Sequence, residues 1–106
     1  MYIEYNDLDL LELFLSEPLS LTGNVGDGEI SYSKEKDGFK ITLQIFAYQM
    51  KCNIYITYRG RDVFDATIKN VTSIVRSDIA LSLKIEEDVV AILYLGKNIS
   101  VSIDQI

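Results

Sequence analysis

Apolar and polar residues alternate over most of the chain from Phe39 onward. The alternating segments are 39–47, 52–59, 64–69, 79–85, 91–95 and 99–103. A repeat of two residues is typical of β-strands, because successive side chains of a strand point to opposite faces of the sheet. The second half of the chain is therefore expected to form a sheet with one apolar face.

The links between these segments are short and rich in turn-forming residues. They are Lys36-Asp37-Gly38, Arg59-Gly60-Arg61-Asp62, Glu86-Glu87-Asp88 and Gly96-Lys97-Asn98. Links of this length join antiparallel neighbours, because a parallel pair needs a crossover of roughly a dozen residues or more. The pattern predicts an antiparallel meander of six or seven strands within residues 29–104.

Residues 7–17 have the repeat of a helix. Asn6 or Asp7 can cap its first turn, and Pro18 stops it, because proline disfavours helical geometry in the residue before it. The residues on one broad face are Leu8, Leu10, Leu11, Phe14 and Leu15. The opposite face carries Asp9, Glu12 and Ser16, with Leu13 at its margin. The predicted fold class is α+β, with an N-terminal amphipathic helix packed on a curved antiparallel meander sheet.

Three glycines stand close together in residues 22–28, at Gly23, Gly26 and Gly28. A phosphate-binding loop needs a strand before it and a helix after it, whereas here the predicted helix comes first. Asp27 and Glu29 would also repel a phosphate. This segment is predicted to connect the helix to the sheet within a single domain that spans residues 1–106.

The composition excludes several classes of function. The chain has no histidine and a single cysteine, Cys52, so it lacks the commonest general base, the usual zinc sites and an internal disulfide. We therefore expect a protein that is not an enzyme and that holds neither a metal nor a cofactor. A net charge of −6 makes nucleic acids and anionic membranes poor partners. The N-terminus has no basic region typical of a secretory signal, which favours the cytoplasm.

The negative charge is concentrated at one end of the sequence. Residues 1–33 contain seven acidic residues and no basic one, whereas the remainder has nine acidic and ten basic residues. A field of one sign attracts partners of opposite charge and speeds their association. Aromatic residues on the second face of the sheet would add contact area. The predicted partner-binding residues are Asp9, Glu12, Leu13, Asp27, Glu29, Tyr55 and Arg59.

The order of elements resembles that of small immunity proteins from bacterial polymorphic-toxin and contact-dependent growth inhibition systems. The resemblance lies in LLELFLSEPLSL, followed by GDGEISYS, FKITLQIF and VFDATIKNVTSI. It implies a non-enzymatic inhibitor that binds one cognate toxin, often a nuclease, in the cytoplasm. The acidic residues would then occupy or shield a basic cleft of the toxin.

Two other functions are compatible with the sequence. The chain could carry a small ligand in a cavity between sheet and helix, or it could be a structural subunit that self-associates through its aromatic second face. The sequence leaves open whether the protein is a monomer or a homodimer.

Overall fold

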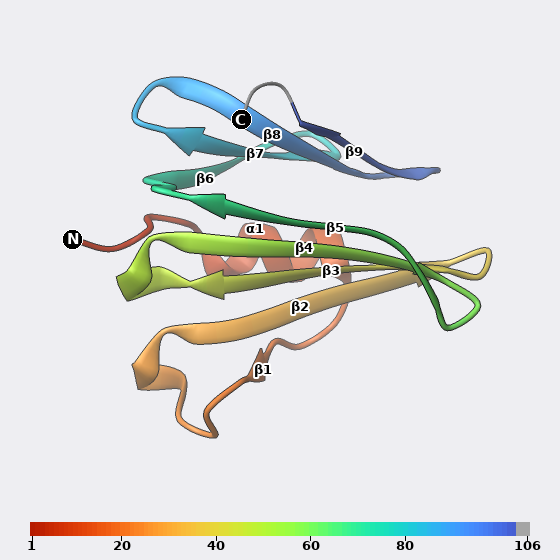
Figure 1. Ribbon diagram of the computed structural model, residues 1–106, viewed down its shortest axis with the longest axis horizontal. Coiled ribbons are helices and arrows are strands. Elements are labelled where there is room, and N and C mark those ends of the chain that lie inside the picture. Colours follow the sequence, from red (N-terminus) through yellow and green to blue (C-terminus); the bar gives the residue numbers. More distant parts are fainter. Residues whose placement is uncertain (104–106) are drawn as a thin grey trace.

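The computed structural model describes residues 1–103, in which one α-helix is followed by nine strands (Figure 1). The elements are α1 (Asp7–Phe14), β1 (Leu19–Ser20), β2 (Glu29–Lys36), β3 (Phe39–Phe46), β4 (Lys51–Tyr58), β5 (Arg61–Lys69), β6 (Ser73–Ser77), β7 (Ala80–Ile85), β8 (Asp88–Leu95) and β9 (Ile99–Ile103). Two 3₁₀ turns, η1 (Val25–Asp27) and η2 (Ala47–Gln49), lie between strands. Within these residues, every strand pairs with its neighbour in sequence and in antiparallel fashion, apart from the change of sheet between β5 and β6.

The strands form two sheets, which corrects the prediction of a single sheet with six or seven strands. The described residues contain a five-stranded sheet, β1-β2-β3-β4-β5, and a four-stranded sheet, β6-β7-β8-β9. The chain changes sheet at residues 70–72, where Asn70 has a φ of 63° and Val71 is fully buried. Alternation in a sequence shows which face of a strand is apolar, but it does not show which strands share a sheet.

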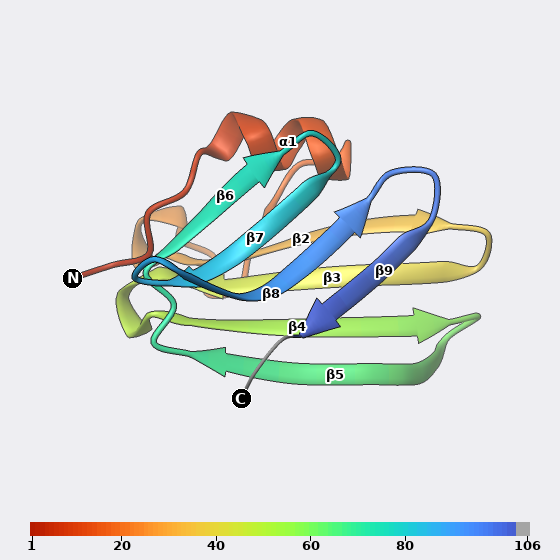
Figure 2. The ribbon, with the colours of Figure 1, turned by 90° about the horizontal axis from the view of Figure 1, so that it is seen from above.

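The two sheets cover each other's apolar faces. Seen from above, β6–β9 lie over β2–β4 with their strands at an angle, and α1 lies beside β6 (Figure 2). The core includes the inward residues of β3, β7 and β8, which are Ile41, Leu43, Ile45, Leu81, Leu83, Ala91, Leu93 and Leu95. These are residues of the alternating segments, so the inward face of each of these strands agrees with the sequence pattern.

The helix is shorter than predicted and is turned differently about its axis. The side chain of Asn6 caps it by accepting hydrogen bonds from the backbone N–H groups of Leu8 (2.9 Å) and Asp9 (3.1 Å). It ends at Phe14 instead of residue 17, because Leu15 adopts a left-handed conformation with a φ of 57°.

The buried face of α1 consists of Leu10, Leu13 and Phe14, whereas Leu8 and Leu15 are 60% and 76% exposed. Five of the eight helical residues are apolar, so the pattern alone did not define a single inward face.

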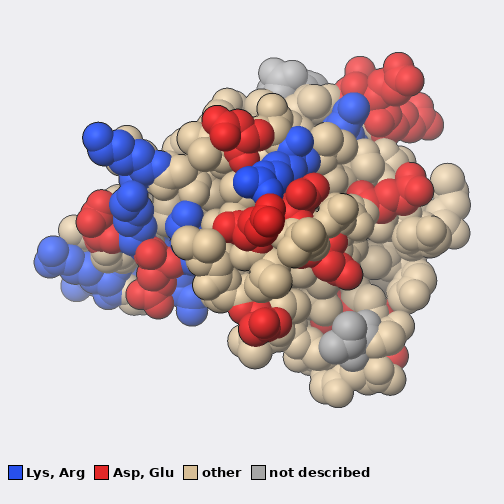
Figure 3. Space-filling model, turned by 180° about the vertical axis from the view of Figure 1, so that it is seen from behind, with Lys and Arg blue, Asp and Glu red and all other residues tan. Residues whose placement is uncertain are grey.

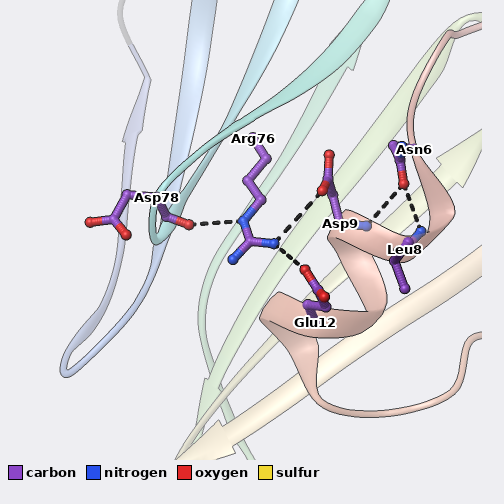
Figure 4. A network of polar contacts seen from close by, with 6 residues as sticks. All are labelled: Asn6, Leu8, Asp9, Glu12, Arg76 and Asp78. Atoms are coloured by element: carbon purple, nitrogen blue, oxygen red, sulfur yellow. Dashed lines mark hydrogen bonds and ion pairs between the residues drawn. The ribbon is translucent and has the colours of Figure 1, made fainter.

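One arginine ties α1 to the second sheet (Figure 4). The guanidinium group of Arg76 in β6 pairs with the carboxylates of Asp9, at 3.7 Å, and Glu12. Its Nε also donates a hydrogen bond to the backbone oxygen of Asp78, at 3.0 Å. This contact holds the outer face of the helix against the edge of the sheet.

We expect Arg76→Met to lower the melting temperature by a few degrees, because exposed ion pairs contribute about 0.2–1 kcal/mol each. Thermal unfolding at low ionic strength and in 1 M NaCl measures the effect, which should shrink in salt. Lys97→Met, at an exposed turn, is the control for removal of one positive charge. Equal melting temperatures for the two variants would contradict a role of Arg76 in holding the helix.

Ionisation of the Cys52 thiol makes the free energy of unfolding depend on pH in the alkaline range. Burial raises the pKa of its thiol from 9.0 to about 12, so the folded protein holds this proton more tightly than the unfolded chain does. Below pH 9 the thiol therefore leaves the free energy of unfolding unchanged. Between about pH 9 and 12 it lowers that free energy by about 1.4 kcal/mol per pH unit.

Replacement of Cys52 by valine should remove this contribution. Urea unfolding between pH 8 and 11 should give a shallower loss of stability for Cys52→Val than for the wild type. A remaining slope is expected from Tyr32, whose pKa is raised from 10.0 to about 12. If the two proteins lost stability in parallel, ionisation of the Cys52 thiol would not be linked to unfolding.

Candidate partner-binding surface

The structure distributes the predicted partner-binding residues over several surfaces. Asp9 and Glu12 are paired with Arg76, so their charges are partly neutralised within the chain. Leu13 was predicted at the margin of the exposed helix face, but it is only 5% exposed and belongs to the core. A side chain buried to this degree offers a partner almost no contact area.

Asp27 and Glu29 lie together at the start of the first sheet. Asp27 is an exposed residue of η1, and Glu29 is the half-buried first residue of β2. Between them, Gly28 has a φ of 73°, and a Cβ at this position would lie 2.8 Å from the ring of Tyr48. The positive φ and the close approach to this ring both favour glycine at this position.

Tyr55 and Arg59 lie on other parts of the molecule. Tyr55 is on the outer face of β4, opposite Asp65 of β5, and is 38% exposed. Arg59 is in the turn between β4 and β5, where its guanidinium group lies 5.2 Å from the centre of the Tyr58 ring. This turn is at the opposite end of the first sheet from η1 (Figure 1). The structure therefore does not bring Arg59 together with Asp27.

Several basic residues lie at the end of the first sheet where the β2–β3 and β4–β5 turns are found. Strand pairing places Lys36, Phe39, Tyr58 and Arg61 in one row across four strands, with Arg59 in the adjoining turn. Figure 3 shows most of the Lys and Arg side chains of that face at one end of the molecule, with Asp and Glu side chains among them, whereas Asp and Glu predominate over the rest of the face. Basic side chains are therefore most frequent at this end, where the acidic residues Glu35, Asp37 and Asp62 also lie.

The N-terminal segment is held by backbone hydrogen bonds to η2, which follows β3, and to the start of the second sheet. The N–H of Ile3 donates to the carbonyl of Ala47 (3.0 Å), and the N–H of Glu4 donates to that of Thr72 (3.0 Å). The carbonyl of Glu4 accepts from the N–H of Ile74 (2.9 Å). These bonds fix the residues that lead into α1, including Tyr5.

Two adjoining hollows flank this segment. The first, which we call the α1–β2 groove, has a volume of about 400 Å³ and is lined by Tyr5, Asp7, Leu8, Leu11, Glu17, Pro18, Ile30 and Tyr32. The second, the N-terminal hollow, measures about 380 Å³ and is lined by Tyr2, Ile3, Glu4, Tyr5, Asp7, Gly26, Gly28, Ala47 and Tyr48. They share Tyr5 and Asp7, and neither is lined by a basic residue.

The carboxylates make the α1–β2 groove electronegative. Burial, followed by the neighbouring Asp7, Tyr5 and Glu17, raises the pKa of Tyr32 from 10.0 to about 12. The pKa of Tyr5 is also raised, first by burial and then by Asp7. Both phenols are therefore neutral hydrogen-bonding groups at neutral pH, and the charge of the groove is that of its carboxylates.

The groove around these tyrosines was not predicted from the sequence, although the spacing of the N-terminal residues indicates part of it. Tyr2 and Tyr5 precede the acidic helix, and Leu8 and Leu11 are spaced three residues apart on it. Their assembly into one surface depends on β2, which supplies Ile30 and Tyr32.

Within residues 1–103 no group of histidine, cysteine and acidic residues is arranged to hold a metal ion. No helix in the same range is long and apolar enough to cross a lipid bilayer.

Sequence comparisons give no relative for this chain, since neither a family model nor a curated protein matches it. Among solved structures, it is similar to a chain of a contact-dependent growth inhibition toxin–immunity protein complex from Klebsiella pneumoniae 342. The TM-score is 0.77 over 96% of each chain, and the sequence identity is 17%. The resemblance inferred from the order of elements is thus confirmed at the level of the fold: the chain shares the fold of a chain from a toxin–immunity protein complex.

Proposed function

We propose that the chain is an immunity-type inhibitor, a non-enzymatic protein that binds a cognate toxin directly and neutralises it. The observation that carries the proposal is the match in fold to a chain of a toxin–immunity protein complex, which extends over 96% of both chains. A fold alone does not specify a function, so the proposal also depends on the chemistry of this chain.

The sequence favours the inhibitor over the toxin of such a pair. A toxic enzyme needs a catalytic group, and this chain has no histidine to act as a general base or nucleophile activator. Its acidic composition instead suits a protein that binds a basic surface. A nuclease is the best candidate for the partner, because an enzyme that binds a polyanionic substrate needs a cleft rich in Lys and Arg.

Inhibition would follow from occupation or shielding of that cleft. Carboxylates in the N-terminal region of the chain would meet the basic residues that normally contact the substrate, and their field would accelerate association. Such a complex would form in the cytoplasm, where a toxin that attacks nucleic acids reaches its target.

The other functions considered from the sequence have less support. Buried apolar side chains from both sheets and α1 occupy the interior of the described residues, and the two hollows described above are open to the surface. Of the aromatic residues on the outer face of the first sheet, Tyr55 is 38% exposed, and the ammonium group of Lys51 lies 4.6 Å from the centre of the Phe46 ring. Neither observation favours a ligand carrier or a self-associating subunit over the inhibitor.

The proposal is tested by capture of a partner followed by protection of cells. The tagged chain is used to isolate proteins from its source cells, and each captured protein is then expressed inducibly with or without the chain. We expect one captured protein to stop growth when expressed alone and to be harmless when the chain is co-expressed. If the chain itself were toxic, or if no captured protein required it for tolerance, the inhibitor assignment would be wrong.

The acidic residues at the start of β2 should contribute to the rate of association. Asp27→Asn combined with Glu29→Gln should slow association with the captured toxin about tenfold at low ionic strength, and less in 0.5 M salt. Glu87→Gln combined with Asp88→Asn removes the same charge from an exposed turn of the second sheet and is the matched control. Stopped-flow or surface plasmon resonance measures both rates. Equal slowing by the two variants would mean that net charge acts, and not this site.

A further inference from the structure

The α1–β2 groove combines apolar walls with two carboxylates. Leu8, Leu11 and Ile30 line it, while Asp7 and Glu17 are exposed acidic residues of the same surface. Leu8 is 60% exposed although it belongs to a helix whose other apolar residues are mostly covered. A single exposed leucine is common on protein surfaces. An exposed leucine that adjoins an apolar groove, next to carboxylates without an ion-pair partner, is typical of an interaction site.

Tyr32 adds a buried polar group to this groove. The residue is 1% exposed, and its ring stacks on Phe14 with 5.4 Å between the ring centres. The residues that affect its hydroxyl electrostatically are Asp7, Tyr5 and Glu17, all of which line the groove. Among the side-chain hydrogen bonds of residues 1–103, none involves this hydroxyl. The hydroxyl is not among the fully enclosed polar atoms without a partner in these residues, so although the ring is buried, the hydroxyl is accessible from the groove and has lone pairs available to a donor there.

The charges of the groove differ from those of the outer helix face. Asp9 and Glu12 already bind Arg76, whereas Asp7 and Glu17 take part in neither of the two ion pairs found in the described residues. No basic residue lines the groove. A cation that paired with these two carboxylates in the groove would therefore come from outside the described residues.

We propose that the α1–β2 groove receives an arginine side chain of the protein partner. The guanidinium group would lie between Asp7 and Glu17 and donate to the Tyr32 hydroxyl, and the aliphatic part of the side chain would cover Leu8 and Leu11. Arginine fits better than lysine, because its planar group presents five donors, is more weakly hydrated and stacks on aromatic rings such as that of Tyr5. The identification of this partner as a toxin rests on the proposed function, whereas the selectivity of the groove for a guanidinium group does not.

Small probes test the groove without any knowledge of the partner. The probe is n-butylguanidinium, and n-butylurea is its neutral isostere. In NMR titrations of the full chain, we expect the guanidinium compound to shift the resonances of Asp7, Leu8, Leu11 and Tyr32 with saturation in the millimolar range. The urea compound should bind about tenfold more weakly, because it lacks the charge that the two carboxylates recognise.

Two double variants locate the site of binding. Asp7→Asn with Glu17→Gln should weaken n-butylguanidinium binding about tenfold, whereas Glu87→Gln with Asp88→Asn should leave it unchanged. The proposal is overturned if the urea compound binds equally well, if the groove resonances do not move, or if both double variants have the same effect.

The captured toxin provides the second measurement. The groove variant should raise its dissociation rate about tenfold, and the control variant should not. An unchanged dissociation rate would overturn the proposal even if the small probe bound the groove. If no toxin is captured, the proposed function fails, while the guanidinium selectivity of the groove is decided by the titrations alone.

Discussion

Mutual burial of two apolar sheet faces is the constraint on which the rest of this structure depends. Leu43 and Ile54 of the first sheet and Leu83 and Leu93 of the second are fully buried, and each sheet supplies the cover that the other needs. The side chains of α1 join the same core through Leu10, Leu13 and Phe14. Because the strands pair almost entirely in sequence order, short turns are enough to build both layers, and the chain crosses between the sheets once, at residues 70–72.

The N-terminal segment positions the residues that form the candidate binding surface on the outside of this core. Its backbone bonds to Ala47 in η2, and to Thr72 and Ile74 at the start of the second sheet, fix the positions of Tyr5 and the start of α1. The orientation of α1 then separates its acidic residues into two groups. Asp9 and Glu12 face Arg76 and stabilise the attachment of the helix, whereas Asp7 lies in the groove formed with β2. One short helix thus contributes both a structural ion pair and unpaired charge for recognition.

The distribution of charge is consistent with recognition of a basic partner by the N-terminal region. Residues 1–33 contain acidic but no basic residues, whereas basic and acidic side chains are mixed at the hairpin turns of the first sheet, so a positively charged surface would be attracted most strongly to the N-terminal region. The likeness to a chain from a toxin–immunity protein complex concerns the fold, and the specific contacts reside in side chains that differ at 17% identity. The exposed carboxylates and apolar groove of this chain are therefore the features that would distinguish its partner.

The sequence by itself determined the local features: the apolar face of the alternating segments, most of the turns, a helix cap at Asn6 or Asp7, and the one-sided distribution of charge. These follow from periodicity and from residue types that act within a few positions. Only the tertiary structure decided that the strands form two sheets, that Leu13 faces inward while Leu8 faces out, and that Asp7, Glu17 and Tyr32 share a groove. The physical reason is that five of the eight residues of α1 are apolar, so packing against β2 and β6 selected the buried face. The groove likewise requires contact between segments distant in sequence, which no local pattern specifies.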